Sequence, residues 1–147
     1  MRASHALALA SALRHCGDGP IRNAVHRLCE VYVESADSIS RRDACSSAFR
    51  DVIRSVPQER IQIVLPELVP VLEFGRHDNE ENVRKVFDEA FSELPVSGVH
   101  QFVDQTIALV APMLAGSSSW SLRKQAAETV AAIARSVGAS LNMDHAK

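Results

Sequence analysis

Apolar residues along the chain recur at intervals of three and four positions, and no alternation typical of a strand persists. This spacing predicts seven helices, at about residues 3–16, 20–36, 39–55, 58–75, 79–94, 98–115 and 119–138. Glycine and proline mark the breaks, with Gly17, Gly19 and Pro20 between the first two helices and Pro57 before the fourth. No linker is long enough to separate two domains, so we expect residues 1–147 to form one all-α domain.

The segment "GRHDNEEN" is predicted to connect two of these helices. It supplies a glycine at the end of one helix, then Asp78 as the N-cap of the next, with Glu81 three residues later completing a capping box. Carboxylates beside His77 could also perform acid–base chemistry. Because acidic groups in a first turn complement the helix dipole, the capping interpretation is favoured.

An internal repeat appears when helices that begin with arginine are aligned at Arg42, Arg84 and Arg123. In each helix, apolar or small residues follow the arginine at the third, sixth, seventh and tenth positions, which is one buried helical stripe. These residues are Cys45, Ala48, Phe49 and Val52, then Phe87, Ala90, Phe91 and Leu94, then Ala126, Thr129, Val130 and Ile133.

Longer apolar helices lie between these repeats and carry a late proline: Pro66 and Pro70 in one, Pro112 in the other. A bent first helix followed by an arginine-led second helix is typical of HEAT repeats. We therefore predict an α-solenoid of HEAT-like helical hairpins, with repeats at roughly 20–55, 57–95 and 97–138. The helix that begins at Pro20 lies close to Arg42 and breaks the strict alternation.

Residues 61–141 resemble a particular group within this class. The order "IVLPELVPVLEFGRHDNEEN", "FDEAFSELP", "SGVHQFVDQTIALV" and "LAGSSSWSLRKQAAETVAAIA" is similar to the C-terminal part of the large eukaryotic HEAT-repeat proteins that serve as proteasome adaptors and scaffolds. In that family a loop of the form S-x-S-W-x-x-K-x-Q precedes an alanine-rich helix. The matching residues here are Ser117, Ser119, Trp120, Lys124 and, in one register, Gln125.

Two features depart from that family. Its members are much longer than this chain, and its acidic helix is rich in tryptophan where this chain has Phe87 and Phe91. The resemblance implies a non-catalytic adaptor that binds the proteasome in the cytoplasm or nucleus. It also implies that this chain is a fragment of a longer array or a severely reduced relative. A scaffold for another client, in nuclear transport, translation control or phosphatase assembly, is the alternative. Exposed solenoid ends would also allow self-association.

Trp120 is the only tryptophan, and three roles are open to it: a ligand platform, a partner anchor or a core plug. Partner anchors are often tryptophan. The sequence favours the plug, because alanines at 126, 127, 131 and 132 leave volume that a large ring could fill.

Basic residues recur at equivalent places in the repeats: Arg42, Arg84, Lys85, Arg123 and Lys124. They could form a ridge that holds an acidic partner, or they could bond to loop acids and carbonyls between repeats, as Asp78 with Arg84 or Arg123 would. The net charge of −2 favours the second interpretation, because a recruiting ridge usually produces a positive charge.

Composition argues against several other classes of protein. With mixed charges and a pI of about 6.3, the chain has no basic stripe for nucleic acid, and no apolar run reaches the ~20 residues of a membrane span. Three widely spaced cysteines, Cys16, Cys29 and Cys45, argue against disulfides and structural zinc, although His26 and Cys29 share a helical face. Residues 1–17 read as an ordinary helix or, alternatively, as an organellar transit peptide; a secretory signal fits less well.

Catalytic motifs are missing from the sequence. The serines at 46, 47 and 117–119 lack the G-x-S-x-G elbow, and Gly17 and Gly19 do not begin a phosphate-binding loop. We expect no enzyme activity and no cofactor; a small enzyme or a metal-binding helical protein is the remaining alternative class.

Overall fold

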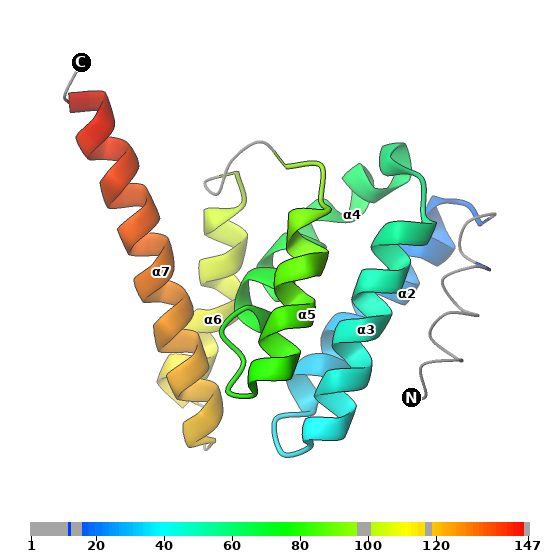
Figure 1. Ribbon diagram of the computed structural model, residues 1–147, viewed down its shortest axis with the longest axis horizontal. Coiled ribbons are helices and arrows are strands. Elements are labelled where there is room, and N and C mark those ends of the chain that lie inside the picture. The colour runs from blue at the N-terminus through cyan, green and yellow to red at the C-terminus, as the bar shows by residue number, and fades with distance from the viewer. Residues whose placement is uncertain (1–11, 13–15, 97–100, 117–118, 146–147) are drawn as a thin grey trace.

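The computed structural model describes residue 12 and residues 16–96, 101–116 and 119–145. In these residues all regular structure is helical, which confirms the all-α prediction. The helices are α2 (Asp18–Glu34), α3 (Ile39–Ser55), α4 (Gln58–Gly75), α5 (Glu81–Ser92), α6 (Val103–Gly116) and α7 (Trp120–His145) (Figure 1). The helix predicted at 3–16 lies almost wholly outside the described residues.

Most predicted boundaries agree closely with the observed ones. The bounds of α3 and α4 equal the predicted ranges, and α2 begins two residues early and ends two residues early. α7 continues to His145, because Gly138 is accommodated inside the helix and does not end it. α6 begins at Val103, later than predicted, and residues 97–100 before it are not described.

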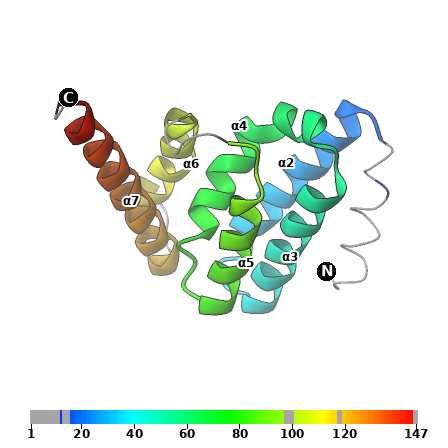
Figure 2. The same cartoon turned by 45° about the horizontal axis from the view of Figure 1, so that its top comes forward.

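The helices pack in two ways. Consecutive helices pair as α2 with α3, α4 with α5 and α6 with α7, and helices two apart also pack, as α2 with α4, α4 with α6 and α3 with α5. α4 therefore has neighbours on several sides, while α7 lies at the end of the molecule farthest from α2 (Figures 1 and 2). α7 packs on α6 and also contacts α4.

The three predicted stripes face the interior. All four stripe residues of α3 are buried, as are Phe87, Ala90 and Leu94 after Arg84, and Ala126 and Thr129 on α7. The remaining stripe residues, Phe91, Val130 and Ile133, are half-buried. This part of the prediction is confirmed, because a helical period fixes which residues share a face.

Aromatic rings join these helices at the centre of the core. The Tyr32 and Phe87 ring centroids lie 4.9 Å apart in an edge-to-face arrangement, and Phe49 lies 5.9 Å from Phe87. Gly75 contributes to the same contact, because a Cβ at this position would lie 2.5 Å from Cγ of Phe87. Glycine is thus required here for the close approach of α4 to α5, and not for a left-handed helix end, since no described glycine has a positive φ.

The predicted capping box is wrong. Glu80 occupies the N-cap of α5 and makes no side-chain cap hydrogen bond. Asp78 lies two residues earlier, is fully buried, and its Oδ1 accepts a hydrogen bond from the amide of Glu80 at 2.9 Å. The aspartate cannot cap α5 because its other carboxylate oxygen is bonded in the core by residues from α2 and α3.

Candidate functional site

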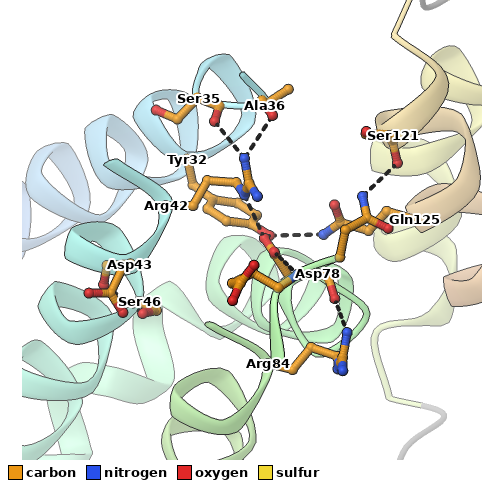
Figure 3. Close-up of polar contacts among 12 residues, drawn as sticks. Tyr32, Ser35, Ala36, Arg42, Asp43, Ser46, Asp78, Arg84, Ser121 and Gln125 are labelled. Atoms are coloured by element: carbon orange, nitrogen blue, oxygen red, sulfur yellow. Dashed lines mark hydrogen bonds and ion pairs between the residues drawn. The ribbon is translucent and has the colours of Figure 1, made fainter. Parts of the chain in front are cut away.

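The principal buried polar group of the described structure is formed by Tyr32, Arg42, Asp78 and Gln125, which we name the Asp78 cluster (Figure 3). The Tyr32 hydroxyl donates to Oδ2 of Asp78 at 2.6 Å, and Nε of Arg42 donates to the same oxygen at 3.0 Å. Nε2 of Gln125 donates to the Tyr32 hydroxyl and to the carbonyl of Phe74, both at 2.8 Å. The cluster therefore connects α2, α3, α4, α7 and the loop before α5.

Every charge in this cluster is compensated. Asp78 is fully buried and Arg42 is 8% exposed, so each would be costly without its partner. Nη1 of Arg42 also donates to the carbonyls of Ser35 and Ala36, at 3.3 and 2.7 Å. Burial, together with the nearby Asp78 carboxylate, raises the pKa of Tyr32 well above its ordinary value of 10.0, so the phenol remains a protonated donor. The Asp78 carboxylate is closed to solvent, and its described partners are groups of the protein itself.

Two further contacts extend from the loop that carries Asp78. Nη1 of Arg84 donates to the Asp78 carbonyl at 2.7 Å (Figure 3). Nδ2 of Asn79 donates to the Ser121 carbonyl at 3.3 Å. The loop thereby bonds to α5 and to the first turn of α7. Arg42 and Arg84, predicted from equivalent repeat positions, both contact Asp78, one at its carboxylate and the other at its backbone.

The predicted core plug is wrong, because Trp120 is 65% exposed. With 3.6 residues per turn, Trp120 lies about 120–180° around α7 from Gln125, Ala126 and Thr129, which are the buried residues of this helix. Its ring faces outward beside Lys124, whose Nζ lies 5.5 Å from the ring centroid. The small residues Ala126 and Thr129 allow α7 to pack closely without a large ring.

The other predicted basic residues lie at the surface. Lys85 pairs with Glu81 at 3.5 Å and Lys124 with Glu128 at 4.0 Å, both one helical turn apart. Arg123 is also exposed. Arg42 is buried, whereas Lys85, Arg123 and Lys124 are exposed. The five predicted basic residues, which also include Arg84, therefore do not share one solvent-facing surface.

A surface groove of about 570 Å³ lies between α2, α4 and α6. α4 packs against both neighbours and so forms the floor between them. The lining residues are His26, Cys29, Glu30, Val33, Glu34, Pro66, Glu67, Pro70, Val71, Gln105, Ala108 and Leu109. Its α6 wall includes the small Ala108, and its α4 lining includes Pro66 and Pro70, which lie one helical turn apart.

The rim of this groove is acidic. His26 lies between two carboxylates, with Nε2 3.0 Å from Glu30 and Nδ1 3.3 Å from Glu67. Cys29 faces α4, where its thiol lies 3.9 Å from the Glu67 carbonyl. Burial, and next the Glu67 carboxylate, raise the pKa of Cys29 to about 12, so the thiol is protonated and acts as a small apolar side chain.

Chemistry-bearing residues elsewhere are dispersed. The three cysteines are free thiols, and burial raises the pKa of Cys45. Burial also lowers the pKa of His77, which favours its neutral form. Within the described residues, no three His, Cys, Asp or Glu side chains gather as a metal site, and no helix there has the length and apolar character to cross a membrane.

The sequence did not identify Tyr32 as a site residue, and it indicated Gln125 only as a match to the tryptophan loop. A signal for Tyr32 existed: it continues the apolar stripe of Ile21, Val25 and Leu28, and a buried phenol needs a hydrogen-bond partner. Nothing in the spacing identifies that partner, because Asp78 is 46 residues away.

Comparison with known proteins gives no match to a family model, to a curated protein or to a solved structure.

Proposed function

We propose that this chain is a non-catalytic protein-binding scaffold, built as an α-solenoid of HEAT-like hairpins. The observation that carries the proposal is the packing order: each helix pairs with its sequence neighbour, and α2, α4 and α6 also pack in succession. Stacked hairpins of this kind present a long surface made from many turns and helix faces, which suits recognition of other proteins.

The interior of the chain supports a binding role over a catalytic one. The charged groups of the Asp78 cluster, Arg42 and Asp78, form an ion pair with each other, and Asp78 is fully buried. A solenoid that holds a client needs a fixed spacing between hairpins, and the cluster provides it by joining α2, α3 and α7 through one carboxylate and its partners.

Trp120 is the proposed partner contact. An exposed tryptophan at the start of α7 exposes a large apolar ring to water, and such rings are enriched among residues that dominate binding energy at protein interfaces. Lys124 beside the ring adds a cation at the same place, with Lys85 and Arg123 as further exposed charges.

The proteasome is the proposed client, in the cytoplasm or nucleus, on the strength of the resemblance carried by "SSSWSLRKQAA". The alternative is a HEAT-repeat scaffold for another client, in nuclear transport, translation control or phosphatase assembly. Self-association through the solenoid ends is proposed as well, since Ile107 and Leu114 of α6 are exposed apolar residues.

The test is affinity purification of the tagged chain from cells of its source, followed by mass spectrometry. We expect proteasome subunits to be recovered with the wild type and lost with Trp120→Ala. Ile39→Ala is the matched control, because Ile39 is a similarly exposed apolar residue, at 55%, at the start of α3. Subunits of another assembly in place of the proteasome would favour the alternative client, and equal recovery with Trp120→Ala would remove Trp120 from the interface.

A further inference from the structure

The groove between α2, α4 and α6 has a floor that favours apolar side chains. Val71 and Pro70 of α4 are buried beneath it, and Val33 and Leu109 are half-buried on its two walls. Its volume of about 570 Å³ lies within the range of clefts that enclose a small ligand or several side chains. An occupant that buries apolar groups here removes this surface from water, which is the main driving force for association.

The rim adds a selection by charge. Glu30 and Glu34 of α2 and Glu67 of α4 stand around the floor, and no described residue that lines the groove is a lysine or arginine. Glu30 lies 3.0 Å from His26 and 3.8 Å from Arg27, and Glu67 lies 3.3 Å from His26. The three carboxylates outnumber the bases that contact them, so the rim carries an excess of negative charge, which repels phosphate-rich ligands and attracts cations.

The spacing of the rim limits the shape of the occupant. The lining residues of α2 extend from His26 to Glu34, which is about 12 Å at 1.5 Å per helical residue. Glu30 and Glu34 lie one turn apart on this wall. A helical segment of about two turns fits this length, and its side chains four positions apart match the separation of the two carboxylates.

We propose that this groove binds a short amphipathic helix of a partner protein that is both apolar and basic. Its apolar residues, at positions i, i+3 or i+4, and i+7, contact Pro70 and Val71 on the floor and Val33 and Leu109 on the walls. Two lysines or arginines one turn apart pair with the carboxylates of the rim. The inference goes beyond the scaffold proposal, because it assigns a ligand chemistry to a surface other than the first turn of α7.

A library of displayed helical peptides, selected on the purified full chain, tests this proposal. We expect the selected peptides to combine leucine or methionine at the apolar positions with lysine or arginine one turn apart. Ala108→Trp fills the groove from an exposed position of α6 and should weaken binding of a selected peptide at least about tenfold. Ala111→Trp is the matched control, since Ala111 is an exposed alanine on the same helix outside the groove.

A second variant pair separates charge from shape. Glu34→Gln with Glu67→Gln should weaken binding about fivefold and reduce its salt dependence, whereas Glu59→Gln, an exposed glutamate near the start of α4, should leave it unchanged. The proposal is overturned by peptides without basic residues, by an absence of selected binders, or by equal binding to Ala108→Trp. Self-association that Ala108→Trp abolishes without peptide would also overturn it, because the occupant would then be a second copy. Recovery of proteasome subunits is a separate readout, so each proposal can fail alone.

Discussion

The Asp78 cluster and the first turn of α7 receive residues from the same short stretch of sequence but have opposite environments. Gln125 is 3% exposed and donates two hydrogen bonds in the core, whereas Trp120, five residues earlier, is 65% exposed. By size and apolarity the tryptophan belongs inside and the glutamine outside. The burial of these two side chains is therefore decided by their position around the helix and by the hydrogen-bond partners in the core. Side-chain hydrophobicity alone does not decide it.

Asp78→Ala is the substitution that should disrupt the Asp78 cluster most. We expect a loss of about 3–5 kcal/mol in the free energy of unfolding, because the Arg42 cation and the Tyr32 hydroxyl would remain buried without their shared acceptor. Chemical denaturation followed by circular dichroism measures it. Asp78→Asn keeps the shape and an acceptor, so its loss should be smaller. A loss below about 1 kcal/mol for Asp78→Ala, the scale of a surface ion pair, would contradict a structural role for the cluster.

An alkaline titration also tests the Asp78 cluster, and its expected effect on stability is intermediate. The folded pKa of Tyr32 is raised above 10.0, so above pH 10 the unfolded chain loses a proton that the folded chain retains. Stability from this group is therefore complete below pH 10 and declines by about 1.4 kcal/mol per pH unit above it, until the folded pKa is reached. Tyrosinate absorbance measures the ionisation directly, since Tyr32 is the only tyrosine.

Cys29 contributes a decline of the same sign from its ordinary pKa of 9.0, so the control is Tyr32→Phe, which retains Cys29. The difference in slope between wild type and Tyr32→Phe isolates the phenol. Equal slopes, or a tyrosine that titrates near pH 10 in the folded chain, would show that the hydroxyl is not held by Asp78 and Gln125.

Substitution of the exposed Trp120 should have the smallest effect on stability. Trp120→Ala is expected to change the free energy of unfolding by less than about 0.5 kcal/mol, as for surface positions without buried contacts. Gln125→Ala, on the same helix, is the matched comparison and should cost about 1–3 kcal/mol, because the Tyr32 hydroxyl and Phe74 carbonyl lose a donor. Thermal melts of both variants measure this; a larger loss for Trp120→Ala would reverse the comparison.

The sequence determined the helices and their inward stripes. Helical period and turn residues act over a few neighbouring positions, so the bounds of α3 and α4 and the burial of Phe49 and Phe87 could be read from the chain. Only the tertiary structure decided that Asp78 bonds to Tyr32 and Arg42, 46 and 36 residues away, that Trp120 faces water, and that α2, α4 and α6 enclose an acidic groove. The physical reason is range: local spacing fixes which residues share a helix face, whereas partners and grooves depend on how faces from distant segments meet.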